Sequence, residues 1–129
     1  MNAKYLEMMN AEELEDYAQI LGFTTKAAKT KAAKVQLIET KRSESAEVEI
    51  FGTKFTIPKK KFHDKTISDL LSKPTRTDDD FVEAIRMLLG DEQYETIYEA
   101  VRDEDGTVDI DGLILVYVRL FQNEALKNF

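Results

Sequence analysis

Alternating apolar and polar residues in the segment 47–57, EVEIFGTKFTI, constrain the fold more than any other feature of this chain. The alternation stops at Gly52-Thr53 and resumes after it, which predicts two short strands joined by a two-residue type I′ or II′ turn. Because a lone hairpin is marginally stable in water, other elements must cover its apolar face. That face is expected to carry two cross-strand pairs, Ile50 with Phe55 and Val48 with Ile57.

Two helices are predicted before the hairpin. Residues 10–22 place apolar side chains at helical spacing. Asn10 and Glu13 have the spacing of a capping box at the start of this helix, and Gly22 is a natural stop at its end. A polar connection then leads to a second helix over residues 31–42, whose narrow apolar face is expected to pack on the first helix.

The segment after the hairpin is predicted to be helical. The acidic run Asp78-Asp79-Asp80 is interpreted as a helix start, where carboxylates accept hydrogen bonds from unpaired amides. The lysines at 59–61 are interpreted as charges that keep the hairpin edge soluble. The expected helices are 64–73, 80–89, 91–102 and about 109–126, the last three packed as an antiparallel bundle with a turn around Gly106.

These elements predict an α+β fold that is mainly α with one β-hairpin. Residues 1–43 are expected to form a helix-loop-helix module, and residues 44–129 to form the hairpin and the helical bundle. No apolar run approaches the length of a membrane span, and the chain has no cysteine. We therefore expect a cytoplasmic protein that does not enter a membrane.

Residues that carry common catalytic or metal chemistry are scarce. His63 is the single histidine, so with no cysteine the usual zinc ligands and a Cys/His nucleophile are lacking. The acidic segment 101–112 partly matches the sequence pattern of a calcium-binding EF-hand loop, but it has Val101 and Gly112 where that loop needs acids. The sequence therefore predicts no enzyme, no metal site and no cofactor.

Charge is segregated along the chain, although the net charge is -7. Residues 24–65 hold eleven Lys or Arg and five acids, whereas residues 66–129 hold six Lys or Arg and fifteen acids. A lysine-rich segment at 26–34 could bind a phosphate backbone, but no arginine or aromatic residue is interleaved to read bases. Nucleic-acid binding is therefore kept as the alternative function. Its candidate residues are Lys26, Lys29, Lys31 and Lys34.

From Val48 to the C-terminus, the order of elements resembles the tail assembly chaperones of long-tailed bacteriophages. The resemblance is carried by VEIFGTKFTIP, ISDLLSK and above all MLLGDEQYETI, in which an apolar helix end is followed by an acid, Gln and an aromatic residue. It implies a factor that binds the long, largely helical tape measure protein and keeps it soluble in the bacterial host cytoplasm until the tail tube polymerises. Residues 8–41 are similar to SAP or helix-extended-helix modules, some of which bind nucleic acid and others protein.

The function expected from this resemblance is the binding of a partner's amphipathic helix against apolar side chains. Large aromatic residues are common anchors of protein interfaces, but the same residues could equally belong to the core. Self-association of the chain is left open. The candidate anchors are Tyr94, Tyr98, Tyr117 and Phe121.

Overall fold

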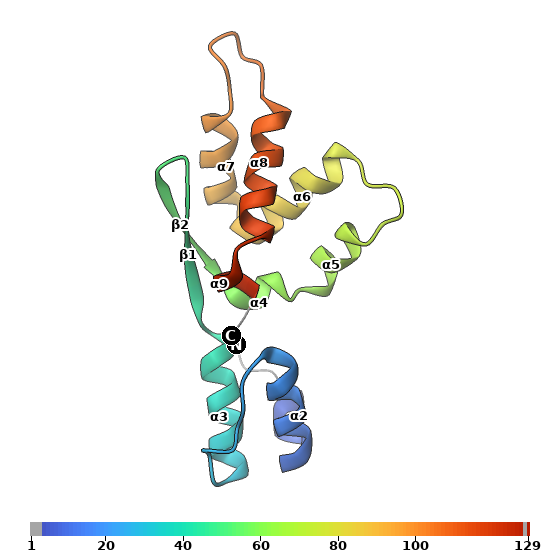
Figure 1. The fold of residues 1–129 in the computed structure, drawn as a ribbon, viewed down its shortest axis with the longest axis vertical. Coiled ribbons are helices and arrows are strands. Elements are labelled where there is room, and N and C mark those ends of the chain that lie inside the picture. Colours follow the sequence, from blue (N-terminus) through green and yellow to red (C-terminus); the bar gives the residue numbers. More distant parts are fainter. Residues whose placement is uncertain (1–3, 128) are drawn as a thin grey trace. The chain divides into compact units, whose positions relative to one another are not determined.

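The computed structural model describes residues 4–127 and residue 129, which divide into two compact units (Figure 1). The N-terminal unit contains the described residues up to Glu44, together with Phe129. The C-terminal unit contains Ser45–Lys127. Each unit has a hydrophobic core of its own.

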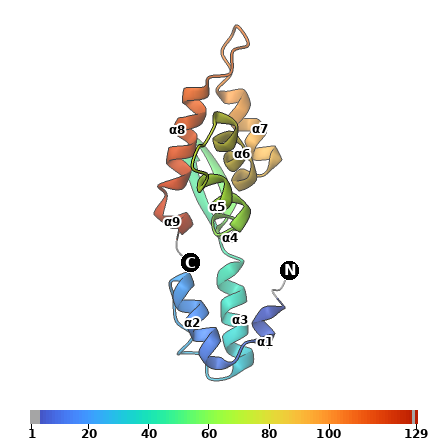
Figure 2. The ribbon, with the colours of Figure 1, turned by 90° about the vertical axis from the view of Figure 1, so that its right-hand side faces the viewer.

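The N-terminal unit is built on α3 (Lys31–Arg42), which contacts both α1 (Tyr5–Met8) and α2 (Ala11–Leu21) (Figure 2). The capping box predicted for α2 is confirmed, because Asn10 and Glu13 each accept a hydrogen bond from the other's backbone amide. The helix ends as expected at Gly22, which has a φ of 103°. The short helix α1 was not predicted. The core of this unit consists of Leu6, Leu14, Ala18, Leu21 and Ile38.

The hairpin has the expected face but a different register. Strands β1 (Ser45–Ile50) and β2 (Thr53–Pro58) are joined by Phe51-Gly52, not by Gly52-Thr53. Both turn residues have positive φ, 54° and 76°, as a type I′ turn requires. The predicted pairs are therefore wrong by two residues. Since the shift is even, the same side chains remain on the covered face, now paired as Ala46 with Ile57, Val48 with Phe55 and Ile50 with Thr53.

The C-terminal unit contains more helices than the sequence predicts. The three lysines at 59–61 lie in a short helix, α4 (Lys59–Phe62), which follows Pro58 directly. The single helix expected at 109–126 is interrupted at Gln122-Asn123, and the chain continues as a separate turn of helix. The remaining bounds are α5 (Lys65–Leu71), α6 (Asp78–Leu89), α7 (Asp91–Ala100), α8 (Ile110–Phe121) and α9 (Glu124–Lys127).

The acidic run does start a helix, as predicted. Asp78, Asp79 and Asp80 occupy the first turn of α6. Thr77 caps that turn, since its hydroxyl accepts a hydrogen bond from the Asp80 amide and its own amide donates to the Asp80 carboxylate. Helix α6 contacts α5, α7, α8 and β2, so it is the centre of this unit. Helices α7 and α8 are antiparallel, and the turn that joins them lies at one end of both helices (Figure 1).

The apolar face of the hairpin is covered, as the sequence argument required. Strand β1 contacts α8 and α9, and strand β2 contacts α4 and α6. The fold is therefore α+β, mostly helical with one antiparallel hairpin. Among the described residues, no helix is long and apolar enough to cross a membrane. The core residues from outside the hairpin are Ile67, Ile85, Leu88, Leu89, Ile97, Val101, Leu113, Val116, Leu120 and Leu126.

Candidate protein-binding surface

Helix α8 is apolar around most of its circumference. Only Asp111 and Arg119 are charged among its 12 residues. One side of the helix, formed by Leu113, Val116 and Leu120, is buried in the core of the C-terminal unit. A surface helix normally carries polar residues opposite its buried side, so the apolar residues that remain on α8 need another explanation.

Those remaining residues form a continuous strip, which we call the α8 stripe. Its members follow the i, i+3, i+4 and i+7 spacing of one helix face. The Ile114 side chain is 38% exposed and Val118 is half-buried. Tyr117 and Phe121 are also half-buried, and they pack against the core. The α8 stripe consists of Ile114, Tyr117, Val118 and Phe121.

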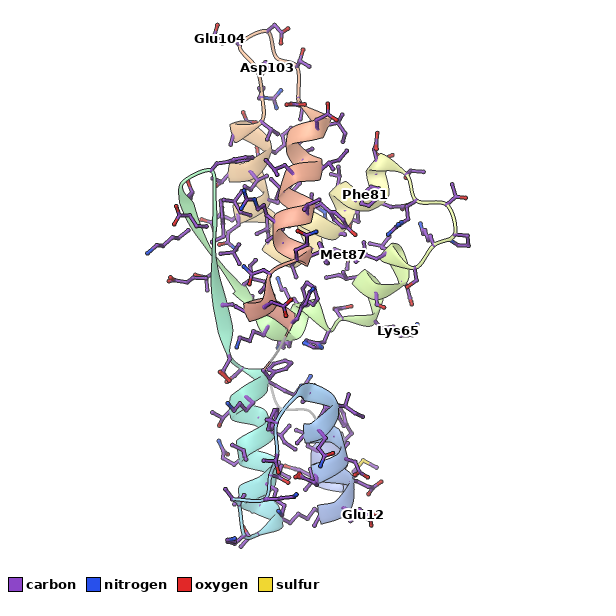
Figure 3. All side chains as sticks on the ribbon, viewed as in Figure 1. Glu12, Lys65, Phe81, Met87, Asp103 and Glu104 are labelled. Carbon is purple, nitrogen blue, oxygen red and sulfur yellow. The ribbon has the colours of Figure 1, made fainter. Side chains whose placement is uncertain are left out.

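Two aromatic rings from other helices extend the α8 stripe. The Phe62 ring in α4 lies 5.2 Å from the Phe121 ring, and the Phe81 ring in α6 lies 4.8 Å from the Tyr117 ring. Figure 3 labels Phe81. Since the Tyr117 and Phe121 rings are 4.7 Å apart, all four rings form one row of adjacent contacts. The guanidinium of Arg76 lies 5.4 Å from the centre of the Phe81 ring and adds a cation beside the row.

The other two predicted anchors form a separate pair on α7. The Tyr94 and Tyr98 rings are 5.7 Å apart, and both side chains are half-buried. Burial raises the pKa of the Tyr94 hydroxyl. The Arg102 guanidinium lies 5.3 Å from the Tyr98 ring centre and pairs with Glu99, so this pair already has a polar cover.

The structure thus divides the four predicted anchors into two pairs and adds two rings that the sequence argument missed. Phe81 is half-buried in α6, and the sequence argument gave it no place on a surface. Phe62 lies in the short helix α4, which the sequence did not predict. The dipeptide Phe62-His63 after three lysines offered little periodicity from which a surface role could be deduced.

A hollow of about 240 Å³ lies on the other side of α8, next to the hairpin turn. Leu115 and Arg119 line it from the helix, and Phe51 lines it from the turn. The Leu115 and Phe51 side chains are 45% and 49% exposed. Apolar surface is therefore exposed on both flanks of α8.

The four lysines of the alternative site are not equivalent in the structure. The Lys31 ammonium donates a hydrogen bond to the Glu7 carbonyl at 2.8 Å, and that of Lys34 donates to the Thr25 carbonyl at 3.0 Å. Both lysines therefore hold the backbone of the N-terminal unit. Lys26 and Lys29 are exposed in the connection between α2 and α3, where they are available to solvent.

Glu15 organises the same connection. Its carboxylate accepts hydrogen bonds from the Thr24 hydroxyl and from the Thr25 amide, whose side chain is fully buried. The Thr24 hydroxyl is the main reason that the pKa of Glu15 lies below its usual value, and the Thr25 amide contributes to the same shift. The position of the lysine-bearing segment thus depends on one ionised carboxylate.

Metal-ligating side chains do not converge in the part of the chain that the structure describes, where no three His, Cys, Asp or Glu residues lie in a group that could hold an ion. His63 lies beside Phe62, and partial burial lowers the pKa of its imidazole.

The fold and the exposed surface together define a small α+β protein whose most unusual feature is an apolar helix that its own core does not cover completely. No known protein family, curated protein or solved structure matches this chain.

Proposed function

We propose that this protein is a phage or prophage tail assembly chaperone that binds the tape measure protein and keeps it soluble in the bacterial cytoplasm. The α8 stripe is the proposed binding surface. The proposal combines the resemblance of the sequence from Val48 onward with the exposed apolar strip on the C-terminal unit.

The observation that carries the proposal is the all-round apolar character of α8. A helix of this kind is normally enclosed by protein, yet Ile114 and Leu115 are 38% and 45% exposed. Contiguous exposed apolar surface is typical of interaction sites. A client helix laid along the α8 stripe would remove both its own apolar side and the stripe from water, which is the main source of binding free energy in helix-in-groove recognition.

The size of the aromatic row suits such a client. The ring-to-ring distances of 5.2, 4.7 and 4.8 Å place the ends of the row at most about 15 Å apart, which is the length of about ten helical residues. A client with apolar residues at i, i+3 or i+4, and i+7 would therefore meet the row over nearly three turns.

Co-expression with the tape measure protein encoded in the same genome tests the proposal. We expect the wild-type chain to bring the tape measure protein into the soluble fraction and to co-purify with it. The variant Ile114→Glu should reduce the recovered complex at least about tenfold, because it places an unpaired charge inside the buried contact. Ile114 is partly exposed, so the variant should still fold.

The matched control is Ile20→Glu, which makes the same change at an apolar side chain that is 80% exposed in the N-terminal unit. It should solubilise the client as well as the wild type does. Circular dichroism must show that both variants are folded. Wild-type protein that leaves the tape measure protein insoluble would refute the proposed function, and equal loss in the two variants would refute the α8 stripe as its site.

A further inference from the structure

Basic side chains gather at the C-terminal end of α8. The contact between the Phe62 and Phe121 rings places α4 at this end, and α4 contains Lys59, Lys60 and Lys61. Arg76 lies over the Phe81 ring, but Asp78, Asp79 and Asp80 lie in the adjoining first turn of α6, so the positive charge of this end comes from α4. Lys60 is exposed, so at least this cation faces solvent.

Acidic side chains gather at the opposite end. The turn that leads into α8 carries Asp103, Glu104 and Asp105 at its tip (Figure 3). Asp109 and Asp111 follow at the start of the helix, and no Lys or Arg occurs between residues 103 and 118. Arg102 also lies at this end, where its guanidinium pairs with Glu99 and donates a hydrogen bond to the Gly106 carbonyl. The α8 stripe therefore runs from an acidic end to a basic end.

The acidic end has a defined geometry. The Asp103 amide donates to the Thr107 carbonyl at 2.7 Å, and Arg102 and Val108 form an isolated antiparallel bridge. The Asp105 carboxylate accepts from the Thr107 amide at 2.9 Å, which lowers the pKa of Asp105 and keeps it ionised. Asp109 caps α8 by accepting a hydrogen bond from the Asp111 amide. The carboxylates of Asp105 and Asp109 are therefore held in place by hydrogen bonds to the backbone.

The two charged ends are far enough apart to act separately. Twelve residues of α-helix are about 18 Å long, about twice the distance over which exposed charges are screened at physiological salt. A partner is consequently attracted at each end by the charge that it presents to that end. A partner with mixed charges along its length gains little from either.

We propose that the α8 stripe selects an amphipathic helix whose charges are segregated, with an acidic end that lies next to α4 and a basic end that lies next to the turn at 103–109. The apolar strip between the ends supplies affinity, and the charges fix the direction in which the partner helix lies. This inference rests on the proposed function, because it specifies the chemistry of the client at the same surface.

Two synthetic peptides of 14 residues test the selection. Both have the same composition and the same apolar stripe at i, i+3, i+4 and i+7. In the bipolar peptide all glutamates lie in one terminal third and all lysines in the other, whereas in the mixed peptide they alternate along the polar face. We expect the bipolar peptide to bind the full chain about fivefold more tightly in 20 mM salt, measured by fluorescence anisotropy, and the difference to vanish in 0.5 M salt.

A charge reversal at one end is the second arm. Lys59→Glu with Lys60→Glu replaces two of the three lysines of α4 by acids, which removes the net positive charge of this end and should remove the preference for the bipolar peptide. The control, Lys26→Glu with Lys29→Glu, makes the same change in net charge in the N-terminal unit. It should leave the preference for the bipolar peptide unchanged. Equal affinity of the wild type for both peptides in 20 mM salt would overturn this inference and leave the proposed function standing. Failure of both peptides to bind at any salt concentration would count against the α8 stripe as a helix-binding surface and against both proposals.

Discussion

The residues of the hairpin turn determine which of two strand registers forms, although both registers place the same apolar side chains on the covered face. Both turn positions have positive φ, and glycine adopts that conformation at Gly52 without a steric penalty. The other position is occupied by Phe51, whose φ of 54° is uncommon for a bulky residue. With Gly-Thr in a type I′ turn, Thr53 would have needed the left-handed conformation, which β-branched residues disfavour more strongly.

The register can be tested by comparing Thr53→Gly with Thr53→Ala. In the observed structure Thr53 is a strand residue paired with Ile50, so glycine should be less stable than alanine by about 0.5–1 kcal/mol. With Thr53 in the turn, glycine would instead be the more stable variant. Urea unfolding of the two variants decides between these outcomes, since the two substitutions remove the same polar atoms.

The Glu15 carboxylate gives the N-terminal unit a specific pH dependence. Its pKa is lower in the folded chain than in the unfolded chain, so its contribution to stability is present above about pH 4.5 and is lost as the pH falls below that value. We expect the thermal midpoint of the wild type to exceed that of Glu15→Gln at pH 7 and to approach it at pH 3. Glu12→Gln, at an exposed position of the same helix, is the control. A difference in thermal midpoint between the wild type and Glu15→Gln that is the same at pH 7 and pH 3 would contradict this role of Glu15.

At the scale of elements, the open edge of β2 forms hydrogen bonds with a side chain and not with another strand. The Gln93 amide in α7 accepts a hydrogen bond from the Thr56 amide at 2.9 Å and donates one to the Thr56 carbonyl at 2.9 Å. It also donates to the Leu89 carbonyl at 2.7 Å. One side chain thus satisfies backbone groups at the edge of β2 and fixes the hairpin against α6 and α7.

Replacing Gln93 by alanine should therefore lower the free energy of unfolding by about 1–3 kcal/mol, because three hydrogen bonds are lost at a partly buried position. The amide of Thr56 should also lose protection from hydrogen exchange. The control Glu95→Ala changes an exposed residue of the same helix. An unchanged rate of hydrogen exchange at the Thr56 amide would show that Gln93 does not protect the edge of β2.

Much of this arrangement could be predicted from the sequence, for reasons that are local. The caps of α2 and α6 and the alternation of the hairpin depend on residues within four positions of one another. The contact of Gln93 with Thr56 joins residues 37 apart, and its specificity depends on the tertiary structure. The break after Phe121 was missed because the residues that follow continue a helical pattern. Helix α4 was missed because it has only four residues, three of them lysines.

The candidate site was predicted only in part for the same reason. Tyr117 and Phe121 are four residues apart, so their common face follows from helical spacing. Phe62 and Phe81 join them through packing between helices, which no spacing along the chain reveals. Phe81 is half-buried in the structure, and its position within α6 does not indicate its contact with Tyr117.

At the scale of the whole molecule, the two units carry different candidate functions. The N-terminal unit uses Lys31 and Lys34 to hold its own backbone, and nucleic-acid binding by this segment stays a prediction. The C-terminal unit covers the apolar face of its hairpin but leaves one strip of α8 partly exposed. We propose that this strip is the surface that contacts a helical client.

A methyl NMR titration tests that claim most directly. The full chain, labelled at isoleucine and valine methyl groups, is titrated with the bipolar helical peptide or with a soluble helical fragment of the tape measure protein. We expect the Ile114 and Val118 methyl signals to shift and to reach saturation as the client is added, while those of Ile20 and Ile38 in the N-terminal unit do not move. Saturable shifts that are confined to the N-terminal unit, or no shift at Ile114 and Val118 while the client binds, would contradict it.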